Sequence, residues 1–100
     1  MIEQRKNQRF ALRLPFHIVG FGPAARPAGE TRNVSSSGVL FTFAAPVPVG
    51  EPIEYVISFP RSHGTRGRVR LHCLGIVLRQ DQESAFAATL ERYEFVRYAI

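Results

Sequence analysis

Short apolar runs separated by turn-forming residues are the feature that most limits what this chain can fold into. The clearest run is residues 10–18, where an apolar side chain occupies every second position. This period of two is typical of a β-strand with one buried face. Pro15 lies inside the run, and proline cannot donate a hydrogen bond to a β-ladder. We therefore expect this strand at an edge or a bulge rather than in the centre of a sheet.

The rest of the chain contains further short strand patterns with no helical pattern between them. We expect strands at residues 31–32, 39–43, 53–59, 69–79 and 84–90. Within 69–79 the apolar positions move from one face to the other near Gly75, which indicates a bulge, a sharp bend or burial of both faces. Tyr93, Val96 and Ile100 have helical spacing, so a short C-terminal helix or tail is expected over 91–100.

Strands at intervals of about ten to fifteen residues favour antiparallel pairing. A closed barrel removes the unpaired edges that such a sheet would otherwise expose. The predicted fold class is therefore all-β, a small six-stranded antiparallel β-barrel. We expect one domain over residues 10–100, preceded by a flexible basic arm over residues 1–9.

Composition restricts the partners and the compartment. The formal net charge is +5, and Lys6 is the only lysine, so the positive charge comes almost wholly from arginine. Guanidinium groups fit phosphates and stack on flat rings, which favours phosphate-bearing ligands. Cys73 is the only cysteine, so no intramolecular disulfide is possible and a reducing compartment is indicated. No apolar run approaches the ~20 residues that span a bilayer. The sequence thus predicts a cytoplasmic protein without membrane insertion.

Residues that could carry catalysis or hold a metal are poorly arranged. Cys73 and His72 are neighbours in a predicted strand, so their side chains point to opposite faces and cannot form a nucleophile–base pair. The three histidines have no metal-ligand spacing with each other or with Cys73. We therefore expect no enzyme activity, no metal and no cofactor.

A polar hexapeptide and a basic arm are the strongest candidates for a binding site. The hexapeptide offers an amide, hydroxyls and backbone N–H groups, or it is simply a turn between two strands: Asn33-Val34-Ser35-Ser36-Ser37-Gly38. Gly38 is able to adopt a positive φ at that turn. Arg5 and Arg9 lie on the arm just before the first strand. If the arm and the turn meet at one end of the barrel, the site would suit a flat purine that carries phosphates.

These two segments together resemble the two-part signature of PilZ domains, RxxxR followed by [D/N]xSxxG. The similarity extends to Leu14-Pro15-Phe16 and to the later strands, and so covers nearly the whole chain. The resemblance implies a six-stranded antiparallel barrel that binds the bacterial second messenger cyclic di-GMP. Arg9 and Arg13 also form an RxxxR, but the spacing from Arg9 to Leu14-Pro15 fits the family better.

The resemblance also implies a role for each motif residue. Arg5 and Arg9 would contact phosphates and guanine, and Asn33 would meet the polar edge of a guanine. Ser35 would hydrogen-bond the ligand, and Gly38 would allow close approach of the backbone. Many members have Asp where this chain has Asn33, and the loss of one charge-assisted bond costs on the order of 1 kcal/mol.

Two other functions are compatible with the same pattern. Between Tyr55 and Gln80 there is no acidic residue, and five arginines lie there: Arg61, Arg66, Arg68, Arg70 and Arg79. This stretch is a solvated face or a surface for nucleic acid, anionic lipid or an acidic protein. The first alternative is thus a nucleic-acid-binding barrel that uses the Arg66–Arg70 strand, although the aromatic residues fall mostly at core positions. The second is a protein-interaction scaffold that binds no nucleotide. The preferred hypothesis is a cyclic di-GMP receptor or adaptor that acts through a downstream protein partner, with no nucleic-acid partner.

Overall fold

The computed structural model describes residues 9–19, 28–60, 68–82 and 84–98. The described residues form seven strands and no helix. The strands are β1 (Pro15–Ile18), β2 (Ala28–Val34), β3 (Gly38–Phe43), β4 (Pro52–Phe59), β5 (Arg68–Gln82), β6 (Ala85–Thr89) and β7 (Arg92–Tyr98). The predicted all-β, six-stranded barrel is confirmed, with one additional strand.

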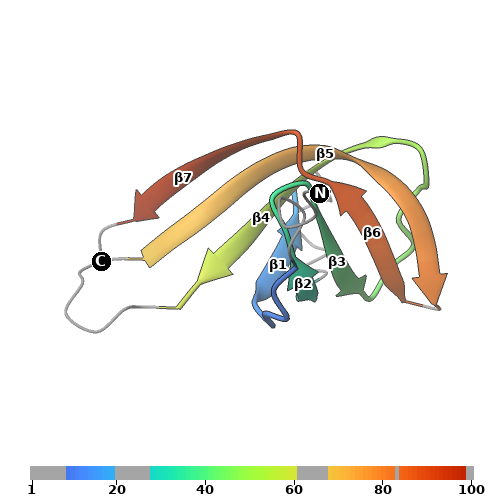
Figure 1. Cartoon of the computed structure of the whole chain (residues 1–100), viewed down its shortest axis with the longest axis horizontal. Coiled ribbons are helices and arrows are strands. Elements are labelled where there is room, and N and C mark those ends of the chain that lie inside the picture. The colour runs from blue at the N-terminus through green and yellow to red at the C-terminus, as the bar shows by residue number, and fades with distance from the viewer. Residues whose placement is uncertain (1–8, 20–27, 61–67, 83, 99–100) are drawn as a thin grey trace, which may run out of the picture.

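The barrel closes through β4 and β5. Six strands follow one another in the order β4-β1-β2-β3-β6-β5, and a further pairing of β4 with β5 completes the ring (Figure 1). Every pairing is antiparallel. The position of β1 differs from the expected edge, because β1 lies between β2 and β4. Pro15 is tolerated since it is the first residue of β1 and pairs only with Glu30 of β2; pairing with β4 begins at Phe16.

The expected strand over residues 10–18 is only partly correct. Regular pairing begins at Pro15, while Phe10 forms an isolated bridge to β2. Phe10 and Leu12 are 54% and 41% exposed instead of buried. The backbone between them and β1 is held by Thr31, whose hydroxyl donates to the carbonyl of Leu12 and accepts from the N–H of Leu14. A buried side chain of β2 thus replaces part of the expected ladder.

Aromatic residues from the inward positions of four strands fill the barrel. Phe16 of β1 stacks on Phe41 of β3 with a centroid distance of 4.1 Å and on Tyr55 of β4 at 5.2 Å. Phe86 of β6 stacks on Phe41 at 5.8 Å. These four side chains are at most 2% exposed. The alternation that predicts strands therefore also predicts the core.

Along β5 the buried face does not change near Gly75, contrary to the expectation. Leu71, Cys73 and Val77 stay buried, whereas Leu74 and Leu78 are 43% and 52% exposed. Gly75 has a different reason to be glycine: a Cβ there would lie 1.8 Å from the carbonyl oxygen of Thr89. The β5–β6 register shifts later, between Val77 and Arg79.

The expected C-terminal helix is wrong, because Arg92–Tyr98 forms β7. β5 has 15 residues and β6 has only five, so β6 leaves part of the β5 edge unpaired. β7 occupies that edge from Arg68 to Leu74. A free helix of this length is only marginally stable, whereas the β5 edge gives the segment a ladder of backbone hydrogen bonds on one side.

Candidate functional site

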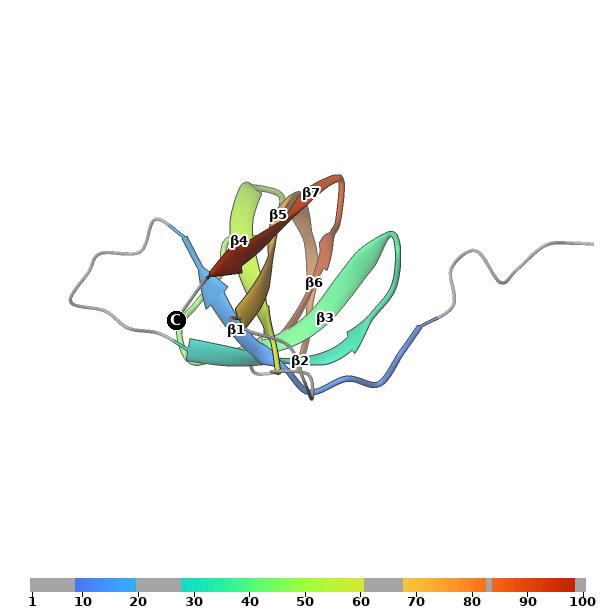
Figure 2. The ribbon, with the colours of Figure 1, turned by 90° about the vertical axis from the view of Figure 1, so that its left-hand side faces the viewer.

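The residues before the first strand join the end of β2 next to the candidate turn. Phe10 and Val34 exchange two backbone hydrogen bonds, with N···O distances of 2.8 and 2.9 Å. The two segments leave the barrel at the same end, on the right of Figure 2. This bridge brings Arg9 to the β2 residue that precedes Val34.

A β-bulge directs Asn33 toward Arg9. The β2–β3 register shifts between Thr31 and Asn33, which leaves Arg32 as the extra residue. Thr31 is fully buried, and in a regular strand Asn33 would point inward as well. Because of the bulge, Val34 packs against the core and Asn33 turns to the outer face. The sequence signal, which the prediction missed, is the spacing of three between the inward residues Thr31 and Val34.

Arg9 and Asn33 are in direct contact. Nη1 of Arg9 donates to Oδ1 of Asn33 at 2.6 Å, and the bond is exposed to solvent. The structure therefore brings one residue of each half-motif together. The first arginine of the RxxxR motif, Arg5, lies outside the described residues.

Ser35 builds the turn between β2 and β3. Its N–H donates to the carbonyl of Gly38 at 2.9 Å, and its hydroxyl accepts from the N–H of Ser37 at 3.2 Å. Ser35 is only 5% exposed. Its side chain therefore holds the shape of the turn, and the expectation that it hydrogen-bonds a ligand remains a prediction.

Gly38 is required by packing inside the barrel. A Cβ at Gly38 would lie 2.8 Å from the carbonyl oxygen of Ala88 in β6. Among the described glycines only Gly50 has a positive φ, at 89°, so Gly38 does not use the conformation expected for it. The turn is tied to β6 a second time, because the N–H of Leu90 donates to the carbonyl of Ser37 at 2.9 Å.

The alternative RxxxR arginine lies elsewhere. Nη1 of Arg13 is 3.5 Å from the carboxylate of Glu30, and both side chains are largely exposed. Glu30 pairs with Pro15, on the far side of the bulge from Asn33. Arg13 therefore serves a surface ion pair, while Arg9 occupies the position beside the turn.

The five-arginine stretch is only partly visible. Arg61 and Arg66 fall outside the described residues, as does the side chain of Arg68. Arg79 donates to the carboxylate of Asp81 at 2.8 Å, and this pairing raises the pKa of Arg79. Arg70 is half-buried, opposite Ser58 in β4 and Val96 in β7. Because only two of the five arginine side chains lie in the described part of the chain, the nucleic-acid alternative stays a prediction.

The single cysteine, Cys73, is expected to be unreactive. Cys73 is 1% exposed, and burial raises its pKa to about 12. The adjacent Tyr55 hydroxyl donates to the carbonyl of Thr89 at 2.9 Å, and burial together with Cys73 raises its pKa as well. A protonated thiol is a poor nucleophile, so Cys73 acts as a small apolar core residue.

Two further searches of the described residues concern metals and membranes. No group of three or more histidine, cysteine or acidic side chains in the described ranges is placed to hold a metal ion. The same residues contain no helix with the length and apolarity needed to cross a membrane.

Comparison with known proteins identifies a family for nearly the whole chain. The family model described as "PilZ domain" matches residues 3–97, which include both half-motifs and all but the last residue of β7. No curated protein and no solved structure was found to match.

Proposed function

The chain belongs to the PilZ domain family, the family of cyclic di-GMP receptor domains, and we propose on this basis that it is a cyclic di-GMP-binding receptor or adaptor module. PilZ domains are typically non-catalytic binding modules. The ligand lies between the RxxxR arm, with Arg5 and Arg9, and the turn that contains Asn33, Ser35 and Gly38.

The observation that carries this proposal is the Arg9–Asn33 hydrogen bond of 2.6 Å. It joins the two half-motifs at one exposed position. A guanidinium group binds a phosphate more strongly than a neutral amide, because the bond is charge-assisted at both ends. Arg9 therefore exchanges the amide of Asn33 for a phosphate, and the released amide donates to and accepts from the edge of a guanine.

The turn itself is already formed. Ser35 and Gly38 hold its shape through internal bonds and close packing on β6. The ligand therefore has little to reorganise at the turn, and preorganisation of this kind favours affinity. The conformational response is in the arm, residues 1–9, which the ligand fixes against the barrel. A downstream protein reads the changed surface.

Calorimetric titration of the purified chain with cyclic di-GMP tests the proposal. GTP and a short single-stranded oligonucleotide serve as control ligands. We expect Arg9→Ala to weaken cyclic di-GMP binding by about tenfold or more, since a hydrogen bond to a charged group contributes ~1.5–3 kcal/mol. Arg13→Ala is the matched control, because it removes another exposed arginine, the one paired with Glu30, and we expect unchanged affinity.

Three outcomes contradict the proposal. The first is an absence of binding heat with cyclic di-GMP, which leaves the scaffold function. The second is equal weakening by Arg9→Ala and Arg13→Ala, which places the ligand elsewhere. The third is salt-dependent binding of the oligonucleotide alone, which supports the nucleic-acid alternative.

Asn33→Asp tests the role of residue 33. A carboxylate forms charge-assisted bonds with guanine N–H groups, so we expect affinity to rise several-fold, a change of about 1 kcal/mol. Asn33→Ala should lower affinity. If both variants bind as well as the parent chain, residue 33 does not contact the ligand.

A further inference from the structure

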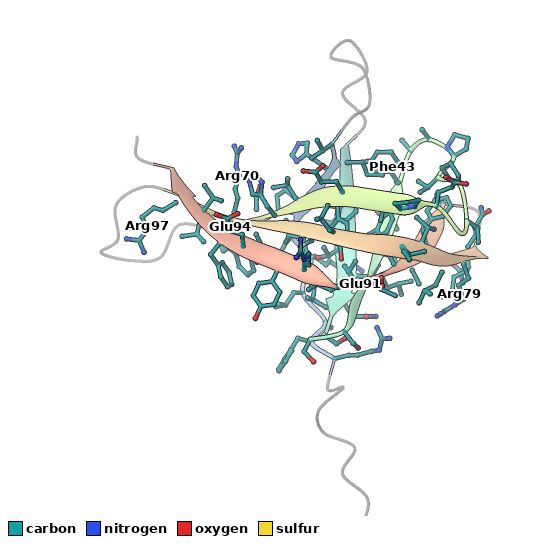
Figure 3. The ribbon with its side chains drawn as sticks, turned by 90° about the horizontal axis from the view of Figure 1, so that it is seen from above. Phe43, Arg70, Arg79, Glu91, Glu94 and Arg97 are labelled. Carbon is teal, nitrogen blue, oxygen red and sulfur yellow. The ribbon has the colours of Figure 1, made fainter. Side chains whose placement is uncertain are left out.

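The added strand β7 is paired on one edge only. Within the described residues, β7 forms a ladder with β5 and with no other strand. It lies along the outside of the ribbon that projects beyond the barrel in Figure 1. Seen from above, Arg97 points away from the barrel near the end of β7 (Figure 3). No described element covers this edge.

The direction of the backbone groups in β5 follows from two hydrogen bonds. Gly50 donates to the carbonyl of Val77, and Val77 donates to the carbonyl of Glu51. The backbone of Val77, an inward residue, therefore points to the β4 side of β5. Directions alternate along a strand, so the inward residues Leu71 and Cys73 also bond toward β4.

The outward residues of β5 consequently bond toward β7. These are Arg70, His72 and Leu74, and their partners in register are Val96, Glu94 and Arg92. The remaining β7 residues, Tyr93, Phe95 and Arg97, therefore direct their N–H and C=O groups to the open edge. This edge offers three donor–acceptor pairs in a row to another extended strand.

Exposed aromatic side chains accompany those backbone groups. Tyr93 and Phe95 are 62% and 60% exposed, and their ring centroids are 6.1 Å apart. Phe59 of β4 lies 6.2 Å from Phe95. Tyr93 pairs in register with Cys73, and Phe95 pairs with Leu71. Both β7 rings therefore lie on the face of the ribbon that continues the interior of the barrel. An apolar strand edge of this kind is a template for strand addition.

We propose that β7 pairs antiparallel with β7 of a second copy of this chain, with the two-fold axis at Phe95. In this register all seven residues of β7 take part. Phe95 faces Phe95 of the partner, and Tyr93 faces Arg97 on both sides of the axis. The cross-strand pairs are thus aromatic–aromatic and cation–π, both of which are favourable.

Charge selects this register over its neighbours. A two-fold axis perpendicular to the sheet keeps the inward side chains of both copies on one face. Each allowed register therefore has one β7 residue on the axis, opposite the same residue of the second copy, and neighbouring registers move the axis by one residue. An axis at Glu94 would set two carboxylates directly opposite each other, which is unfavourable. An axis at Val96 would shorten the overlap and leave Tyr93 without a partner inside β7. The Phe95 register has neither fault, and its isologous symmetry closes the assembly as a dimer.

Sedimentation equilibrium of the whole chain over a wide range of concentration tests this assignment. We expect a monomer–dimer equilibrium that Phe95→Lys abolishes, because a charge facing the edge strand prevents edge-to-edge pairing. Leu78→Lys is the control, since Leu78 is 52% exposed on the outer face of β5. It should leave the equilibrium unchanged. A monomer at every concentration, or a dimer that survives Phe95→Lys, overturns the proposal.

Disulfide trapping tests the register. Paired residues in an antiparallel ladder have Cα atoms about 4.5–5.5 Å apart, within reach of a disulfide. Native Cys73 is buried and does not interfere. Phe95→Cys should form an intermolecular disulfide under mild oxidation, whereas Leu78→Cys should form none. Equal cross-linking of the two variants would show random collision and contradict the Phe95 axis. Circular dichroism confirms that each variant is folded.

Discussion

β6 and β7 run along the same edge of β5, yet they have opposite surroundings. Both pair antiparallel with β5, one with its C-terminal half and the other with its N-terminal half. β6 also pairs with β3, and its residues from Ala85 to Ala88 are all buried. β7 has no second neighbour among the described residues, and its Tyr93 and Phe95 stay exposed. The same backbone ladder therefore produces either core or surface, according to what lies on the other side.

The two strands separate where β3 begins, because the last residue of β6, Thr89, pairs with the first residue of β3, Gly38. Leu90 donates to Ser37 in the turn, and the next N–H, from Glu91, donates to Leu74 of β5. At this junction the turn of the candidate ligand site is also hydrogen-bonded to the barrel, through Ser37 and Leu90. The difference between β6 and β7 thus divides the molecule into a closed barrel, which holds the turn in place, and a projecting ribbon, which is open to a partner.

Truncation of a phenylalanine in each strand should show the largest difference. Phe86→Ala in β6 removes a ring that is 2% exposed and stacked on Phe41, and we expect a loss of about 3–5 kcal/mol in the free energy of unfolding. Phe95→Ala in β7 removes a ring that is 60% exposed, and it should cost less than about 1 kcal/mol. Urea denaturation of dilute, monomeric protein measures both, and equal losses would contradict the division.

A smaller effect is expected at Gly75 of β5. Gly75→Ala would place a methyl group 1.8 Å from the Thr89 carbonyl oxygen, a backbone atom that cannot move alone. We expect destabilisation of about 3 kcal/mol, the upper part of the usual range for overpacking. Gly38→Ala, with a closest approach of 2.8 Å, is the comparison and should cost less. The reverse order in denaturant midpoints would show that the backbone around Gly75 and Thr89 can move to accommodate a methyl group.

Removal of the Tyr55 hydroxyl tests the packing at the junction between β6 and β7. Tyr55→Phe removes the 2.9 Å hydrogen bond to the carbonyl of Thr89 inside the barrel, and we expect a loss of about 1 kcal/mol. Tyr93→Phe removes a hydroxyl from an exposed ring of β7 and should be neutral. If Tyr55→Phe were also neutral, water or another group would have to satisfy that carbonyl.

The smallest expected effect is the pH dependence of the unfolding temperature that Cys73 contributes. Burial raises the pKa of Cys73 from 9.0 to about 12, so the folded state retains a proton that the unfolded state loses. The stability from this group is complete below pH 9 and is lost as pH rises from 9 toward 12. Cys73→Ala should flatten the decline in thermal unfolding temperature above pH 9. An unchanged decline would attribute it to other groups, such as Tyr55.

The comparison of β6 with β7 also shows which strands can be predicted from the sequence alone. The β6 pattern identifies a strand because alternating apolar residues and polar flanks suffice. In the segment that becomes β7, Tyr93 and Val96 have helical spacing, whereas in the strand their partners Cys73 and Arg70 lie on opposite faces of β5. Their state depends on a free edge of β5, which exists only because β5 is three times as long as β6. No local pattern contains that information.

In the candidate site, too, some features are readable from the sequence and others are not. Its residues are readable from the RxxxR and NxSxxG spacings. The sequence placed the arm and the turn at strand ends, but it left open whether the two ends coincide. The outward direction of Asn33 was not expected, because it results from the bulge at Arg32. The positive φ expected at Gly38 is absent, and close packing on Ala88 is a reason for glycine there that the sequence did not reveal. Its role in ligand approach stays a prediction.

What the sequence determined by itself is the antiparallel all-β fold, most of the core, and the family. These depend on a period of two, on turn residues and on motif spacing, which are local properties of the chain. The tertiary structure alone decided which segment occupies the β5 edge, which way Asn33 points, and why Gly38 and Gly75 are glycines. Each of these is settled by an atom that is distant in sequence, and the cost of a clash or an unpaired backbone group with that atom exceeds local preferences.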